Sequence, residues 1–149
     1  MNLRFLNHRD LKPIKRMFKD QFGIEETLPY VLMLSEKDDL YAVSEEIKDI
    51  DLEHLRTHTI GIYVGQVKKG VFRPSIEGST ILGPLATKNV LNVDLKIQRM
   101  WMYGLDIPCA DGTVEGFVII KSGNNWCGSG WKKEGNILNH VPKGRRIHE

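Results

Sequence analysis

Side chains that could bind a metal or attack a substrate are few in this sequence and poorly spaced for either task. Its five histidines have no paired cysteines near them, so the spacing typical of a zinc site is missing. The glycine-rich patterns GxGxxG and GxxxxGKS or GxxxxGKT, which hold nucleotide phosphates, do not occur. The sequence therefore predicts no metal site and no cofactor.

The two cysteines are the remaining candidates for covalent chemistry. Cys109 lies close to Asp106 and Asp111, whose negative charges oppose the thiolate that a nucleophile needs. We interpret Cys109 as a structural or surface residue and Cys127 as a buried strand residue. The sequence thus predicts that the protein is not an enzyme. Two isolated cysteines are also typical of a reducing cytosol, which favours a cytoplasmic protein.

Basic side chains interleaved with aromatic ones point to binding chemistry instead. The candidate residues form two groups that are distant in the sequence, Lys68, Lys69 and Arg73 in the first and Lys132, Lys133, Asn139, His140, Lys143, Arg145 and Arg146 in the second. Lysine and arginine attract phosphates, and exposed aromatic rings stack on unpaired RNA bases. We expect the cations to form one phosphate-binding face, with Asn139 and His140 nearer a base or a sugar.

Each of these residues also has a structural interpretation. The basic clusters could form a solvated rim that contacts no ligand. Asn139 and His140 could bond to the backbone and hold the turn at Pro142–Gly144. Core packing is favoured over base stacking for three nearby aromatic side chains, Phe72, Trp126 and Trp131.

Charge is distributed unevenly along the chain, although the net charge is only +2. The segment from Glu25 to Glu53 holds ten acidic side chains against two lysines, a charge of −8. The rest of the chain has nineteen basic and nine acidic side chains, a charge of +10. A basic surface of this kind most often meets nucleic acid, and the acidic segment should lie off that surface because carboxylates repel phosphates.

Two structural units are expected to position these residues. In residues 1–56, apolar spacing and capping signals predict a helix that begins at Asn7 or Asp10 and ends at Gly23. The elements expected to follow it are strands at Pro29–Leu34 and Leu40–Ser44 and a short helix capped by Ser44. This unit is interpreted as a small α/β domain.

Residues 57–149 are richer in glycine and in short β-type runs. The expected strands are a run holding Ile60 to Val64 and the segments 114–121, 125–131 and 136–141. A short helix is predicted between Asp94 and Gly104, and Gly78–Ala86 is interpreted as a connecting region. Short, regularly spaced strands are typical of a compact antiparallel barrel or sandwich. The predicted fold class is therefore α+β, with a mostly antiparallel β-barrel as the second domain.

Several C-terminal segments resemble the PUA-like RNA-binding domain that ends bacterial ribosomal-RNA cytosine-5 methyltransferases. The segments are IGIYVGQVKKGVFRPS, MYGLDIP and GFVIIKSGNNWCGSGWKKEGNILNHVPKGRR. The family pattern G-x-x-K-K-x-x-F-x-P matches Gly65–Pro74. The closing pattern N-H-x-P-K-G-x-R matches Asn139–Arg146, while Leu138 stands where the family has lysine. Residues 1–56 leave no room for a methyl-donor domain, so Cys109 is not carried over as a catalytic residue.

The resemblance implies a PUA-like β-barrel over residues 57–149 and a function in binding structured RNA. Residues 1–56 are similar to the small α/β domain that precedes PUA domains in archaeal and eukaryotic ribosome-biogenesis factors. The implied RNA is ribosomal or transfer RNA, bound during RNA modification or ribosome biogenesis. In the alternative, the protein is an accessory subunit whose acidic N-terminal domain recruits a separate RNA methyltransferase or another ribosome-assembly protein. No apolar run is long enough to cross a membrane, so no membrane partner is expected.

Overall fold

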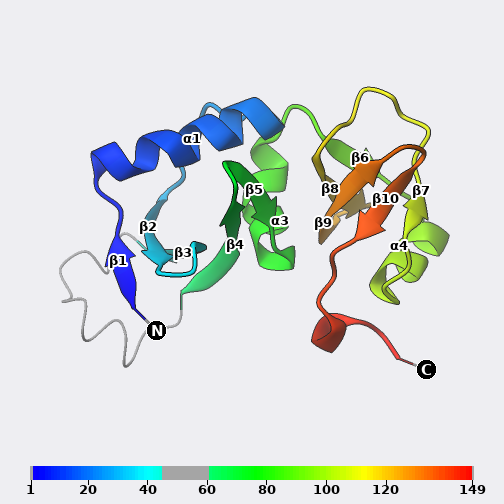
Figure 1. Ribbon diagram of the computed structural model, residues 1–149. Coiled ribbons are helices and arrows are strands. Elements are labelled where there is room, and N and C mark those ends of the chain that lie inside the picture. Colours follow the sequence, from blue (N-terminus) through cyan, green and yellow to red (C-terminus); the bar gives the residue numbers. More distant parts are fainter. Residues whose placement is uncertain (1, 45–60, 149) are drawn as a thin grey trace.

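The computed structural model describes residues 2–44 and 61–148, which form an α+β structure with two five-stranded sheets (Figure 1). The strand order is β1-β2-β3-β4-β5 in the first sheet and β6-β8-β9-β10-β7 in the second. One of the two sheets curls into a half-barrel. Within the described ranges, no helix has the length and apolar character needed to cross a membrane.

The first sheet is antiparallel throughout and packs against helix α1. Its strands are β1 Leu3–Phe5, β2 Tyr30–Ser35, β3 Asp39–Ser44, β4 Ile62–Lys68 and β5 Val71–Pro74. Helix α1 spans His8–Phe22 and lies along the upper side of this sheet in Figure 1. The predicted helix and the two predicted strands are confirmed, while β1 was not expected.

Helix α1 is bounded by the two residues that the sequence indicated. The side chain of Asn7 accepts a hydrogen bond from the backbone N–H of Asp10, whose carboxylate in turn accepts from the Asn7 backbone, and together they form a capping box. Gly23 ends the helix with φ at 67°, a left-handed conformation that glycine adopts without steric cost. Ile14, Phe18 and Phe22 share the buried face.

The second sheet combines antiparallel hairpins with one parallel pair, β6 and β8. Its strands are β6 Val90–Asn92, β7 Ile107–Pro108, β8 Phe117–Ser122, β9 Asn125–Lys133 and β10 Asn136–Asn139. Helix α4, Leu95–Met102, is capped by Asp94 and followed by Gly104, as predicted. The three expected strands are confirmed as β8, β9 and β10.

The prediction of a connecting region at Gly78–Ala86 was wrong. The chain forms helix α3, Ile76–Leu82, and a 3-10 turn, η2, Gly83–Leu85. Ser75 caps α3, and Gly78 packs so closely on β4 that an added Cβ would lie 1.8 Å from the backbone oxygen of Val64. Glycine is present in α3 because it allows this close tertiary contact. Since glycine disfavours helices, the sequence of α3 did not indicate a helix.

The expected division between residues 56 and 57 lies inside the first sheet. Strands β3 and β4 fall on opposite sides of it and are hydrogen-bonded neighbours, with Asp39 opposite Gln66. The boundaries of the two sheets therefore do not coincide with residue 56. The short helix expected after Ser44 lies in residues 45–60, outside the described part of the chain.

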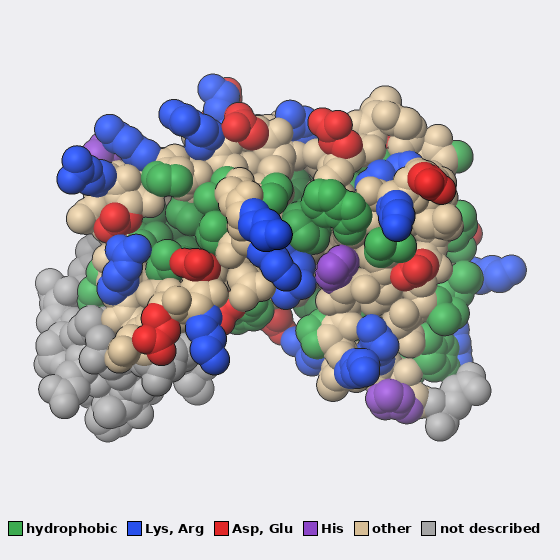
Figure 2. Space-filling model, in the orientation of Figure 1, with side chains coloured by type: hydrophobic (Ala, Val, Ile, Leu, Met, Phe, Trp, Pro, Cys, Tyr) green, Lys and Arg blue, Asp and Glu red, His purple; other side chains and the backbone are tan. Residues whose placement is uncertain are grey.

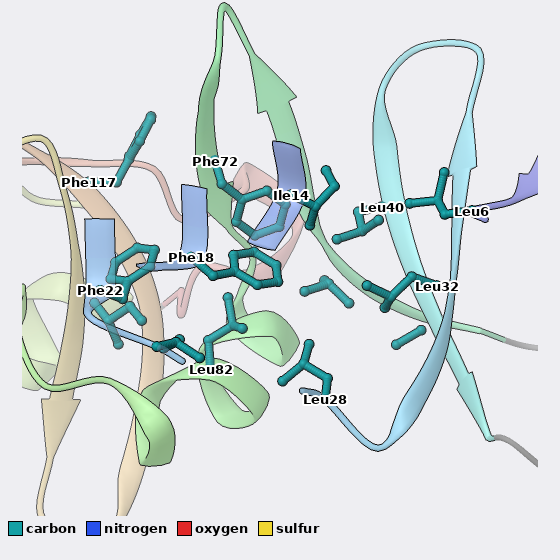
Figure 3. Packing of buried hydrophobic residues seen from close by; sticks show 14 residues of the cluster. Leu6, Ile14, Phe18, Phe22, Leu28, Leu32, Leu40, Phe72, Leu82 and Phe117 are labelled. Carbon is teal, nitrogen blue, oxygen red and sulfur yellow. The ribbon is translucent and has the colours of Figure 1, made fainter. Parts of the chain in front are cut away.

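The two sheets share a hydrophobic core. Figure 3 shows its larger cluster, in which Phe18 and Phe22 of α1 pack with Phe72 of β5 and Leu82 of α3. Phe117 and Ile119 of the second sheet belong to the same cluster. A second cluster around Trp101 lies between α4 and the other face of the second sheet. Because one core joins both sheets, the residues at their junction are held in fixed positions.

Candidate nucleic-acid interface

The junction of the two sheets brings the two sequence-distant basic groups close together. The buried hydroxyl of Ser129 in β9 donates to the backbone oxygen of Pro74 in β5, at 2.7 Å. The backbone N–H of Gly128 donates to the hydroxyl of Ser79 in α3, at 2.9 Å. These two bonds hold β9, and hence the C-terminal segment that follows β10, beside Arg73.

Arg73 and His140 meet at this junction, and the charge of exposed Lys68 acts on His140. Arg73 and His140 line one small cavity of about 50 Å³, together with Tyr63 and Pro142. Burial, followed by the positive charges of Arg73 and Lys68, holds the pKa of His140 below its usual value of about 6.5. The imidazole is therefore neutral at pH 7, beside two cations.

Aromatic rings extend this cationic site across the surface of the second sheet. The ring of Phe117 packs edge-on against Trp131, with centroids 4.9 Å apart, and against His140, with centroids 5.7 Å apart. Phe117 is buried, whereas Trp131 is 38% exposed. We call Lys68, Arg73, Phe117, Trp131 and His140 the central patch. Figure 2 shows lysine and arginine side chains beside a histidine and hydrophobic side chains near the middle of the visible face.

The geometry of the central patch favours contact across a surface over enclosure of a small substrate. A cavity of about 50 Å³ has room for water but not for a nucleotide. Tyr63 lines it, and its hydroxyl lies 3.2 Å from Asp39. Burial, with Asp39 as the next cause, raises the pKa of Tyr63 to about 12, so this phenol stays protonated. Because the cavity is too small to enclose a nucleotide, a ligand would lie over the rings and cations of the central patch.

Besides Arg73, which donates to the side-chain oxygen of Gln66 at 3.3 Å, three of the predicted phosphate-binding residues are engaged in contacts within the protein. The ammonium group of Lys132 donates to the backbone oxygens of Cys109 and Glu134. Arg145 forms an ion pair with Glu77 of α3, at 2.6 Å. Arg146 donates from Nε to the backbone oxygen of Val141, at 3.1 Å. The structure therefore does not bring these three residues into the central patch.

Asn139 has the structural role that the sequence left open. Its side-chain nitrogen donates to the backbone oxygens of Trp101 and Leu105, at 2.8 and 2.9 Å. Its side-chain oxygen accepts from the backbone N–H of Val141, at 2.8 Å. Both amide hydrogens and the oxygen are thus used in joining β10 to the end of α4, and the expected base contact by this residue has no geometric support.

The remaining predicted cations lie at exposed positions around the patch. Lys69 is in the β4–β5 turn with φ at 53°, and Lys133 ends β9. Lys143 begins the 3-10 turn η3, Lys143–Arg145, directly after Pro142, which lines the same cavity as Arg73. These three side chains are placed to reach a ligand larger than the patch itself.

The two cysteines and the possible metal ligands were considered in the sequence as alternatives to binding chemistry. Both cysteines are free and buried. Burial raises the pKa of the Cys127 thiol, which disfavours its reactive thiolate form. Among residues 2–44 and 61–148, no three histidine, cysteine, aspartate or glutamate side chains gather closely enough to hold a metal ion.

Two contributors to the surface were not predicted from the sequence. Phe117, the ring that links Trp131 to His140, was expected only as part of a strand. Helix α1 carries exposed basic residues whose helical spacing is visible in the sequence, so plotting charge around the predicted helix would have found them.

The acidic segment is described only in part, since residues 45–53 lie outside the described ranges.

Comparison of the chain with protein-family models and with curated proteins finds no match.

Proposed function

We propose that this protein binds RNA without catalysing a reaction, and that the central patch is its contact surface. The observation that carries the proposal is the convergence of Lys68 and Arg73 on His140, beside the exposed ring of Trp131. Cations next to aromatic rings match the two chemical features of an RNA strand, its phosphates and its unpaired bases.

Each residue of the central patch has its own role in the proposed recognition of RNA. Arg73 and Lys68 contact phosphates, with the guanidinium able to offer two donors to one phosphate. Trp131 stacks on an unpaired base, and Phe117 supports it from below through an edge-on contact. Neutral His140 donates or accepts a single hydrogen bond at a base or sugar.

The class of RNA comes from the resemblance to PUA-like domains and forms part of the proposal. On this basis the ligand is structured RNA of the ribosomal or transfer type, and the protein acts in RNA modification or ribosome assembly. Crosslinking in cells, followed by sequencing of the RNA recovered with the protein, identifies the ligand directly. Recovery of no RNA above background would contradict the assignment.

Tryptophan fluorescence tests the stacking contact in the full-length protein. Trp101 is fully buried and Trp126 lies under the ammonium group of Lys121, whereas the ring of Trp131 is exposed. A single-stranded RNA oligonucleotide should quench the wild-type emission as it binds. Trp131→Phe should keep most of the affinity and lose the quench. Trp131→Ala should lower the affinity about 5- to 100-fold, the range expected for loss of one stacked base.

Trp126→Phe provides the matched control, because it removes a half-buried tryptophan and leaves the central patch intact. It should retain both the affinity and the quench. A quench that survives Trp131→Phe and disappears in Trp126→Phe would place the bound base elsewhere. Unchanged affinity in Trp131→Ala would contradict the proposed role of the central patch.

A further inference from the structure

One side of helix α1 carries a row of basic side chains that lies outside the central patch. Arg9, Lys12 and Arg16 follow at spacings of three and four residues, which places them on the same side of the helix. All three are exposed. We call these residues the α1 flank. Figure 2 shows lysine and arginine side chains along the upper edge of the molecule, where Figure 1 places α1.

An open groove of about 420 Å³ lies between the α1 flank and the β4–β5 turn. Lys12 and Arg16 line it from the helix, and Gly70 and Val71 line it from the hairpin. Asp20 is the acidic member of its lining. Exposed Lys68 and Lys69 directly precede Gly70, so positive charge outweighs negative charge around the groove.

A neighbouring face of α1, next to the α1 flank, differs in its electrostatics. Lys15 and Lys19 line a second groove, of about 550 Å³, together with Glu25 and Glu26. Arg16 and Asp20 lie on the ridge between the two grooves and line both. Lys19 lies 3.6 Å from the carboxylate of Glu25. Acidic side chains thus offset the lysines on this side. These two neighbouring faces of one helix therefore form a pair for comparison.

The α1 flank is held in a fixed position relative to the central patch. The side chain of Gln21 in α1 accepts from the backbone N–H of Phe72, at 2.7 Å, and donates to its backbone oxygen, at 2.8 Å. The next residue along β5 is Arg73. A ligand that spans the groove and the patch would find both surfaces already ordered, which lowers the entropic cost of binding both.

We propose that the α1 flank and the β4–β5 turn form a second phosphate-binding surface, which takes the backbone of a base-paired RNA stem while the central patch takes adjoining unpaired bases. This inference rests on the proposed RNA-binding function. Lys68 connects the two surfaces, because it acts on His140 and lies two residues before Gly70 of the groove. The groove lining contains no aromatic ring, so it offers contacts to phosphates but no platform for a base.

Two labelled RNAs test the division of roles in the full-length protein. One is a hairpin with a base-paired stem and an unpaired loop, and the other is a single-stranded oligonucleotide with the sequence of that loop. Lys12→Ala combined with Arg16→Ala should weaken hairpin binding about 3- to 30-fold and leave the single strand unaffected. The slope of log affinity against log salt for the hairpin should fall by about 1.8, the value for two duplex phosphates.

Lys15→Ala combined with Lys19→Ala is the matched control, since it removes two charges from the same helix. Alanine favours helix formation at all four positions, so both variants should fold. Equal losses in the two variants, equal losses on the two RNAs, or no loss would each overturn the inference. A loss of binding to vesicles containing phosphatidylserine without a loss on RNA would overturn it in favour of a membrane surface. Failure of the wild-type protein to bind either RNA would instead overturn the proposed function.

Discussion

Two regions of this molecule have similar basic side chains and use them differently. In the central patch, Arg73 and Lys68 lie beside a neutral imidazole and an exposed ring. Outside the patch, Lys132 of β9 and, after β10, Arg145 and Arg146 bond to backbone oxygens or to a carboxylate of the same chain. Arg73 donates one hydrogen bond from a terminal guanidinium nitrogen to the side-chain oxygen of Gln66, at 3.3 Å, and its other donors face the central patch in our proposal. The second group bonds to the fold itself.

The difference shows that basic residues clustered in a sequence need not cluster on a surface. Side chains that are neighbours in a strand point to opposite faces of the sheet. Trp131, which pairs with Leu138, therefore lies on one face of β9, and Lys132, which pairs with buried Ile137, lies on the other. Residues far apart in the chain meet instead, since Arg73 and His140 line one cavity. The difference between the two groups can be tested by measuring protein stability, the coupling energy of one ion pair, the pH dependence of stability and affinity, and the salt dependence of RNA affinity.

The largest effect on stability is expected for Asn139→Ala. This change removes three side-chain hydrogen bonds and leaves the backbone oxygens of Trp101 and Leu105 without that partner. The free energy of unfolding should fall by about 2 to 3 kcal/mol, which lowers the melting temperature by roughly 5 to 10 °C. Calorimetry measures this shift. RNA affinity below the transition should stay unchanged, and altered preference among RNAs with intact stability would restore a base-contacting role.

A smaller effect is expected for Arg145→Ala. Its ion pair with Glu77 is half exposed, and such pairs contribute about 0 to 1 kcal/mol to the free energy of unfolding. Glu77→Gln should cause a similar loss, and a double-mutant cycle measures the coupling between them. RNA affinity should be the same in wild type and Arg145→Ala. A clear weakening of RNA binding would move Arg145 into the interface.

The smallest effect concerns the protonation of His140. Its lowered pKa means that the folded protein binds fewer protons than the unfolded chain between that value and about 6.5. The free energy of unfolding should therefore fall as the pH is lowered through this window, and His140→Gln should remove that contribution. Denaturant unfolding at a series of pH values measures the difference. An identical pH dependence in both proteins would contradict the assignment.

RNA should shift the same equilibrium in the opposite direction. A phosphate bound beside Arg73 and Lys68 favours the imidazolium form of His140 and raises its pKa. The affinity for RNA should then increase about threefold or less as the pH falls below 6.5, and His140→Gln should lack this increase. NMR titration of the imidazole with and without RNA measures the shift directly. An unchanged His140 pKa would place the phosphate elsewhere.

The secondary structure was predictable where local signals act within one element. Asn7 and Gly23 bound α1, and Asp94 begins α4, because caps satisfy the backbone groups at helix ends. Helix α3 was missed because Gly78 and Gly83 serve tertiary contacts, with Val64 and Trp126 respectively. The parallel pairing of β6 with β8 depends on distant partners and has no local signal.

Which residues of the candidate site lie together was predictable only in part. Lys68, Arg73 and His140 were expected together, and the structure gathers them. The engagement of Lys132 could not be foreseen, because its acceptors are backbone oxygens that every residue carries. The hydrogen bonds of Asn139 could not be foreseen either, since its acceptors are backbone oxygens of Trp101 in α4 and of Leu105 in the α4–β7 connection.

The central claim is that Lys68 and Arg73 contact phosphates while Lys132 and Arg145 do not. Two matched double variants test it, Lys68→Ala with Arg73→Ala and Lys132→Ala with Arg145→Ala, because each removes two positive charges. The decisive measurement is the slope of log affinity for RNA against log salt concentration. The slope should fall by about 1.4 to 1.8 in the first variant and stay at the wild-type value in the second. Equal slopes in the two variants would contradict the division between the cations of the central patch and the cations that bond within the fold.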